Sequence, residues 1–157
     1  MGNFNPQNLV ELALKVEEKG AKVYNQLAEK FASNSEISET FRLLARDEQI
    51  HYNQFLALKK EIPETLDNIS KTSEEFFNYI DLERYFLLFD SVSELDKILK
   101  YAYDFERDTY IFYTAIRDAV GKFEVLDSII EFEKSHMIKL LQYILTESKF
   151  RGIADKF

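Results

Sequence analysis

Two short motifs have the residue types and the spacing of a metal site. The chain has only two histidines, and each follows a glutamate by three positions, at Glu48 and His51 and again at Glu133 and His136. Residues three apart on a helix project from the same face, so each pair can hold one metal ion with a carboxylate and an imidazole. The spacing therefore predicts two metal-binding motifs on helices.

The sequence repeats itself around these motifs. In the first half Glu17 is followed seven residues later by Tyr24, and in the second half Glu106 is followed seven residues later by Tyr113, in each case ahead of the motif. Two helical hairpins related by a pseudo-two-fold axis would bring four glutamates and two histidines to one point. This is the ligand set of di-iron and di-manganese carboxylate bundles. The predicted ligands are Glu17, Glu48, His51, Glu106, Glu133 and His136.

The charge of such a cluster supports the same interpretation. Four carboxylates inside a bundle would be prohibitively costly without compensation, and two divalent cations would balance them. Oxygen-rich sites with one imidazole for each metal suit iron or manganese, and ligand softness does not choose between the two. The alternative is that each glutamate lies at the edge of an apolar face and each histidine is a satisfied core residue. That would leave an acidic all-α domain without a site.

Four long helices are predicted to position these residues. Apolar residues recur at helical spacing, and only four glycines and two prolines interrupt the chain. Helices of about 25 residues are each about 38 Å long, which makes a four-helix bundle the natural architecture. We predict a single all-α domain over residues 1–157, with core helices at about 6–32, 36–60, 94–119 and 123–148.

The segment between the second and third helices is too long for a turn. It is predicted to be a crossover that contains a short amphipathic helix within residues 74–89, which would make the second and third helices parallel. Ser93, followed by Asp96, is predicted to cap the third helix. Residues 150–157 are predicted to form a tail after the fourth helix.

Composition excludes several other kinds of site. The chain has no cysteine, which excludes disulfides, thiolate zinc sites, iron–sulfur clusters and thiol catalysis within it. The net charge of −8 disfavours nucleic acid and anionic membrane surfaces as partners. No apolar stretch approaches the roughly 20 residues that a membrane helix needs, and no signal-peptide pattern is visible at the start. A cytoplasmic location is expected.

The sequence around the predicted ligands resembles the rubrerythrin branch of the ferritin-like family, over roughly Leu9 to Leu145. The resemblance rests on Glu17-Glu18-Lys19-Gly20 with Tyr24, on Leu43-Leu44-Ala45-Arg46-Asp47-Glu48-Gln49-Ile50-His51, on Glu106-Arg107-Asp108 with Phe112-Tyr113, and on Glu131-Phe132-Glu133-Lys134-Ser135-His136. It implies a ferritin-like bundle with a long crossover between helices two and three, and the same six residues as ligands of two metal ions. Iron is the expected metal and manganese the alternative. Relatives are often dimers, so a homodimer is an expectation.

Two departures from the family pattern affect what the resemblance implies. Many rubrerythrins add a rubredoxin-like domain whose cysteines hold iron. Since this chain has none, a separate electron donor is expected. The peroxidases of the family are also expected to carry a further glutamate one turn before the third-helix ligand. Tyr103 stands at that position here, which places efficient peroxide reduction in question.

Three further residues are candidates for supporting the ligands. Tyr24 and Tyr113 are predicted to donate hydrogen bonds to carboxylates, the alternative being that they are ordinary core aromatics. Asp47 is predicted to accept the free N–H of a liganding imidazole, most plausibly that of His136, unless it is exposed. Its counterpart in the second half is Phe132, so the site would be asymmetric.

The predicted function is a redox reaction of a dimetal carboxylate centre with peroxide or dioxygen, either rubrerythrin-like peroxide reduction or iron oxidation. No catalytic side chain separate from the metal ligands is expected. One alternative is a dimetal oxygenase that acts on an organic substrate. Another is a helical interaction module that metal stabilises without catalysis.

Overall fold

The structure is a computed structural model that describes residues 6–62 and 80–154, with side chains described as far as residue 146. It has no strands within these ranges. Its helices are α1 (Pro6–Lys30), α2 (Ser35–Glu61), α4 (Leu82–Ser91), α5 (Leu95–Val120) and α6 (Glu124–Ala154).

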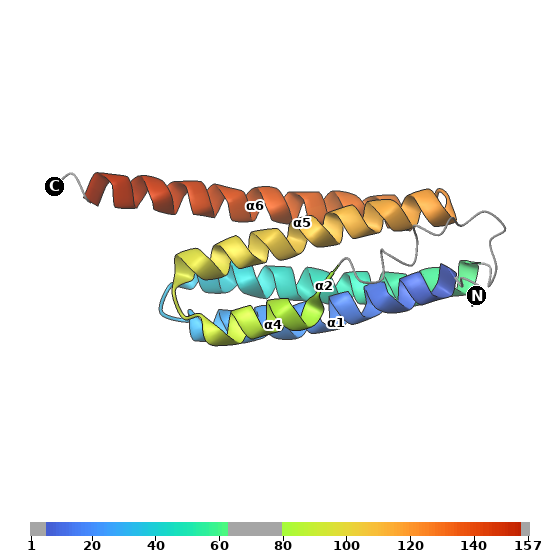
Figure 1. The fold of residues 1–157 in the computed structure, drawn as a ribbon, viewed down its shortest axis with the longest axis horizontal. Helices are drawn as coiled ribbons and strands as arrows, with labels where there is room; N and C mark the ends of the chain where they lie inside the picture. The colour runs from blue at the N-terminus through green and yellow to red at the C-terminus, as the bar shows by residue number, and fades with distance from the viewer. Residues whose placement is uncertain (1–5, 63–79, 155–157) are drawn as a thin grey trace.

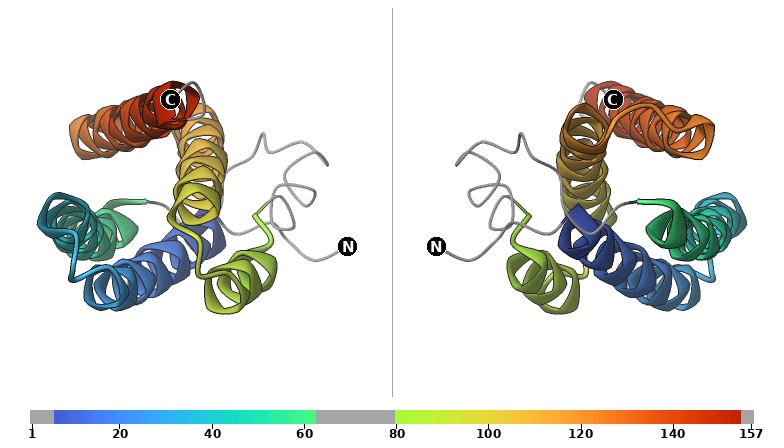
Figure 2. Two further views of the ribbon diagram at one scale, coloured as in Figure 1. Left: turned by 90° about the vertical axis from the view of Figure 1, so that its left-hand side faces the viewer. Right: turned by 90° about the vertical axis from the view of Figure 1, so that its right-hand side faces the viewer.

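The four long helices form two antiparallel hairpins that pack against each other (Figure 1). One hairpin is α1 with α2, and the other is α5 with α6. The α2 and α5 helices run in the same direction, as the predicted crossover requires. The end-on views show α4 beside α1 and α5, outside the square of long helices (Figure 2). The all-α prediction and the ferritin-like bundle are thus confirmed.

Residues at the helix ends account for where α2 and α4 begin and where α5 ends. The side chain of Asn34 accepts a hydrogen bond from the Ile37 amide at the start of α2, and Asp81 does the same for the Arg84 amide at the start of α4. Gly121 ends α5 with a φ of 97°, a conformation that L side chains rarely adopt.

Two predicted helix boundaries were wrong. The N-cap of α5 is Glu94 and not Ser93, and it makes no side-chain cap hydrogen bond. The acidic Asp96 in the first turn complements the positive end of the helix dipole instead. The α6 helix runs on to Ala154, through residues predicted to be a tail, because no proline stands in it and its first glycine is Gly152. The predicted short helix in 74–89 corresponds to α4, although residues 74–79 lie outside the described ranges.

The interior of the bundle combines aromatic packing with an unusual number of buried charged residues. Its largest fully buried side chains include Tyr24, Tyr113, Phe41, Phe55, Phe105 and Phe112. Buried among them are four glutamates and both histidines, which are rarely found fully buried without partners.

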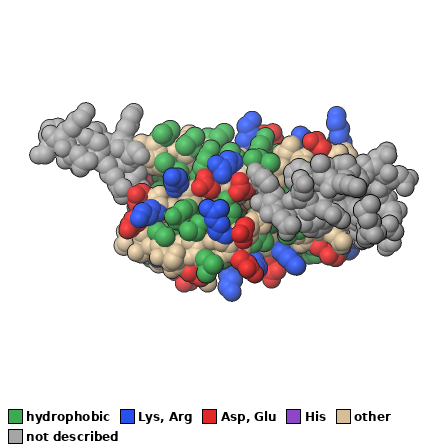
Figure 3. Space-filling model, viewed as in Figure 1, with side chains coloured by type: hydrophobic (Ala, Val, Ile, Leu, Met, Phe, Trp, Pro, Cys, Tyr) green, Lys and Arg blue, Asp and Glu red, His purple; other side chains and the backbone are tan. Residues whose placement is uncertain are grey.

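On the outer face drawn in Figure 3, acidic and basic side chains are interspersed and no histidine shows among the coloured atoms. Among the described helices, none combines the length and the apolar character that crossing a membrane requires.

Candidate metal centre

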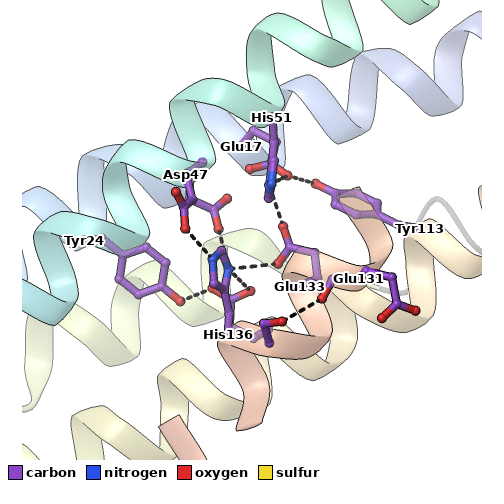
Figure 4. A network of polar contacts seen from close by, with 11 residues as sticks. Glu17, Tyr24, Asp47, His51, Tyr113, Glu131, Glu133 and His136 are labelled. Carbon is purple, nitrogen blue, oxygen red and sulfur yellow. Dashed lines mark hydrogen bonds and ion pairs between the residues drawn. The ribbon is translucent and has the colours of Figure 1, made fainter. Parts of the chain in front are cut away.

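The structure brings all six predicted ligands together inside the bundle. Four of them, Glu17, His51, Glu133 and His136, are labelled in Figure 4. The four glutamates are fully buried, and the histidines are 1% and 5% exposed. These residues form two groups, and within each group the ligand atoms all lie within 4.8 Å of one another. The first group is Glu48, Glu106, Glu133 and His136, and the second is Glu17, His51 and Glu133. Glu133 belongs to both groups and therefore lies between two candidate metal positions.

Both imidazoles present the same nitrogen to the carboxylates. Nδ1 of His51 lies 3.0 Å from Oε1 of Glu133 and 3.5 Å from Oε1 of Glu17. Nδ1 of His136 lies 3.7 Å from Oε2 of Glu106 and 3.7 Å from Oε2 of Glu133. In both halves, the ring nitrogen that faces the cluster is the one that could bind a metal.

The two predicted tyrosines hold carboxylates across the hairpins. The Tyr24 hydroxyl of α1 donates to Oε1 of Glu106 in α5 at 2.6 Å, and the Tyr113 hydroxyl of α5 donates to Oε1 of Glu17 in α1 at 2.7 Å. Each tyrosine therefore orients a glutamate of the opposite hairpin. The remaining Oε2 atom of each of these glutamates has no hydrogen-bond partner.

Asp47 and Phe132 make the two halves of the centre unequal. Oδ2 of Asp47 lies 2.9 Å from Nε2 of His136, which directs the other nitrogen of that ring toward the carboxylates. At the equivalent place in the second half, the Phe132 ring packs edge-on against His51, with centroids 5.6 Å apart. A carboxylate thus supports one imidazole, while an aromatic ring that is 48% exposed covers the other.

This asymmetry predicts that Asp47 strengthens one metal position. Asp47→Ala is expected to weaken metal binding at the His136 position by about 10- to 100-fold, the usual effect of losing the partner of a liganding histidine. Competition with a chromophoric chelator would measure the two affinities separately. Gln49→Ala, at an exposed position of the same helix, is the control and should leave both affinities unchanged. Equal affinities in Asp47→Ala and the wild-type chain would contradict the prediction.

Gly20 provides room for one of the carboxylates. A Cβ atom at this position would lie 3.0 Å from Oε2 of Glu48, closer than nearly all such contacts. Glycine within a helix costs about 1 kcal/mol relative to alanine, so a residue without a side chain here is explained by the approach of Glu48. The α1 helix is thereby fitted to a carboxylate on α2.

Burial and mutual repulsion raise the pKa of several of the glutamates in the metal-free chain. Burial, reinforced by neighbouring carboxylates, raises the pKa of Glu17 and of Glu48 well above the ordinary value. The same causes raise the pKa of Glu106 to about 8. Glu133 is the exception: burial acts to raise its pKa, but Glu106 and the two imidazoles lower it overall.

The pKa of each histidine is also raised, although burial acts against this rise. Burial acts to lower the pKa of each imidazole, yet the pKa of His51 is raised by Glu133, and that of His136 is raised well above its usual range by Asp47 and then by Glu106. Protons held by these groups would offset part of the negative charge of the cluster in the metal-free chain. Metal ions would displace the protons, since ligands bind metals in their deprotonated forms.

The unpaired polar atoms of the interior test whether metal ions fit this cluster. Within the described residues, the buried side-chain atoms without a hydrogen-bond partner are Glu17 Oε2, Glu48 Oε1 and Oε2, Glu106 Oε2, Glu133 Oε2, His136 Nδ1 and Thr109 Oγ1. A buried atom left unpaired costs about 1–3 kcal/mol, so such a concentration at one point calls for a ligand. All but one are carboxylate or imidazole atoms of the predicted ligands, a donor set that suits iron or manganese. The residues therefore fit two divalent cations.

Thr109 is a fully buried residue of α5 that its sequence pattern did not single out. A single threonine on a helix has no spacing that distinguishes it, although it falls on the inward face of α5 between Glu106 and Tyr113. Tyr103, which stands where the family's peroxidases are expected to carry a further glutamate, is only half-buried and makes no hydrogen bond to a ligand within the described part of the chain. The side chain that adjoins Glu106 on the buried stripe one turn along the helix is thus Thr109.

Comparison with known proteins agrees with the geometry. The model of the Rubrerythrin family matches residues 8–144. A solved structure of a candidate ferritin-like diiron-carboxylate protein from Thermotoga maritima is similar to this chain, with a TM-score of 0.68 and 26% sequence identity. The similarity covers 92% of this chain and 97% of that one. No curated protein matches the chain.

Proposed function

Since the chain belongs to the rubrerythrin family, we propose that it is a non-haem di-iron protein that carries out a redox reaction with peroxide or dioxygen. The observation that supports this most directly is the cluster of buried carboxylate and imidazole atoms that have no hydrogen-bond partner. Such atoms are costly in a protein that does not bind cations and are expected in one that does.

The ligand groups indicate which residues would hold each ion. Glu106 and His136 would bind one ion, Glu17 and His51 the other, and Glu133 would contact both, with Glu48 beside the first. Iron bound there would polarise an O–O bond and supply one electron from each ion.

The protein's own groups would prepare this centre in three ways. Tyr24 and Tyr113 fix the orientation of one oxygen of Glu106 and of Glu17 and leave the second oxygen for the ion. Asp47 fixes the tautomer and the ring orientation of His136. The buried aromatic residues around the cluster exclude bulk water, which strengthens electrostatic interactions within it.

The proposal includes a separate electron donor. The 157 residues contain no cysteine, so they do not include a rubredoxin-type iron site. Electrons that restore the reduced state would therefore have to come from a donor outside these residues.

Anaerobic loading with ferrous iron tests the proposed function. We expect about two iron ions per chain by metal analysis, and a rapid rise in near-ultraviolet absorbance when one equivalent of hydrogen peroxide or of dioxygen is added. Running both oxidants in parallel would show which one reacts faster. Iron binding without an absorbance change under either oxidant would overturn the redox proposal and favour a bundle that metal merely stabilises.

A further inference from the structure

Thr109 differs from every other threonine on the described helices. The hydroxyls of Thr40, Thr114 and Thr146 each donate to the carbonyl four residues earlier, at 2.9, 2.9 and 2.8 Å respectively. This is the usual way for a helical threonine to satisfy its hydroxyl. Thr109 is fully buried, and its hydroxyl has no hydrogen-bond partner. A hydroxyl without a hydrogen-bond partner is costly in a buried position, and Thr109 is the threonine on these helices that carries one.

Helix geometry places Thr109 beside two residues of the proposed metal centre. On α5 it lies one turn after Glu106 and one turn before Tyr113, within about 60° of both around the helix axis. Both neighbours reach the cluster, since Glu106 accepts from Tyr24 and Tyr113 donates to Glu17. The unpaired hydroxyl therefore shares the inward face from which α5 contributes to the centre.

The other hydroxyls at the centre are already committed. Those of Tyr24 and Tyr113 donate to carboxylates, and the carboxylates themselves can only accept once they are ionised to hold metal. Peroxide, the two-electron-reduced form of dioxygen, carries lone pairs that need hydrogen-bond donors when it leaves water. Among the described hydroxyls at the cluster, Thr109 is the one that remains able to donate to it.

We propose that Thr109 is a positioning residue, whose hydroxyl donates a hydrogen bond to the peroxide-class ligand that enters the dimetal centre. This inference rests on the proposed function and adds to it a residue that orients the incoming oxygen ligand without binding metal. It also explains the unpaired hydroxyl. Because Thr109 does not donate to a carbonyl of its own helix, its hydroxyl is available to a ligand that is present only part of the time.

Azide binding to the ferric, iron-loaded chain tests the proposal without relying on turnover. Azide is a small linear anion with terminal lone pairs, and its binding to iron is followed by a charge-transfer absorption band. Thr109→Val keeps the shape and removes the hydroxyl, Thr109→Ser keeps the hydroxyl, and Thr114→Val removes a hydroxyl that its own helix already satisfies. We expect azide to bind about tenfold more weakly to Thr109→Val, and as in the wild-type chain to the other two.

Iron content and thermal stability separate a positioning role from a structural one. All three variants should retain the iron content of the wild-type chain, and metal-free Thr109→Val should be no less stable, because the lost hydroxyl had no partner. Unchanged azide affinity in Thr109→Val would overturn the proposal, as would loss of its iron or a marked loss of stability. If the wild-type chain bound azide but did not react with peroxide or dioxygen, the proposed reaction would fail while the role of Thr109 could still be read from the titration.

Discussion

Replacing Glu133 with glutamine is expected to reduce the bound metal from about two ions per chain to less than one. Glu133 is the only residue that belongs to both ligand groups. It also lies against both imidazoles, at 3.0 Å from Nδ1 of His51 and 3.7 Å from Nδ1 of His136. The substitution keeps the size of the side chain but removes the charge that both cations would share. Metal analysis after anaerobic loading would measure the loss.

Glu131 on the same helix is the matched control for this change. It is exposed, and Figure 4 shows its side chain pointing away from the cluster. Glu131→Gln removes the same charge from α6 and should retain the metal content of the wild-type chain. If Glu133→Gln also retained two ions, the assignment of Glu133 to both positions would be wrong. If each variant lost metal equally, the effect would arise from the overall charge and not from coordination.

The metal-free chain is expected to become less stable as the pH rises from about 5 to about 8. The pKa of Glu106 is raised from 4.5 to about 8 in the folded chain, and those of Glu17 and Glu48 are also raised. Between these pH values the folded state holds protons that the unfolded state has released, so the free energy of unfolding falls with rising pH. The raised pKa values of His51 and His136 act in the same direction.

The lowered pKa of Glu133 acts only in acid, because its contribution is lost as the pH falls below the ordinary value of 4.5. Several groups that change together should lower the melting temperature by roughly 10 °C across this range. Circular-dichroism melts in the presence of a chelator would measure it. Metal should stabilise the chain more at pH 8 than at pH 5, because its ligands bind it deprotonated. A melting temperature that stayed constant or rose with pH in the metal-free chain would contradict this.

Most of the fold and the ligand cluster could be predicted from the sequence because the signals are periodic. A helix of 25 residues repeats its apolar pattern many times, and each ligand motif recurs in the second half with the same internal spacing. Helix ends are decided by single residues, so the capping of α5 and the length of α6 were predicted wrongly. Thr109 was missed for the same reason, since one buried hydroxyl leaves no pattern.

The partners of the two tyrosines show a different limit. Sequence spacing places Tyr24 near Glu17, but two turns along a helix separate the residues by about 10 Å. The structure pairs Tyr24 with Glu106 and Tyr113 with Glu17, across the two hairpins. Which carboxylate a tyrosine reaches depends on how the two hairpins pack. The residue spacing within one hairpin does not predict that packing.

The two reciprocal hydrogen bonds between the hairpins have a consequence for the ancestry of the fold. Glu17 in one hairpin and Glu106 in the other are each oriented by the tyrosine of the opposite hairpin. One hairpin associating with a second copy of itself would form the same two bonds by symmetry. Gene duplication and fusion of such a self-associating unit would produce this arrangement, and later divergence of one half, such as Asp47 against Phe132, would then distinguish two positions that began as equals.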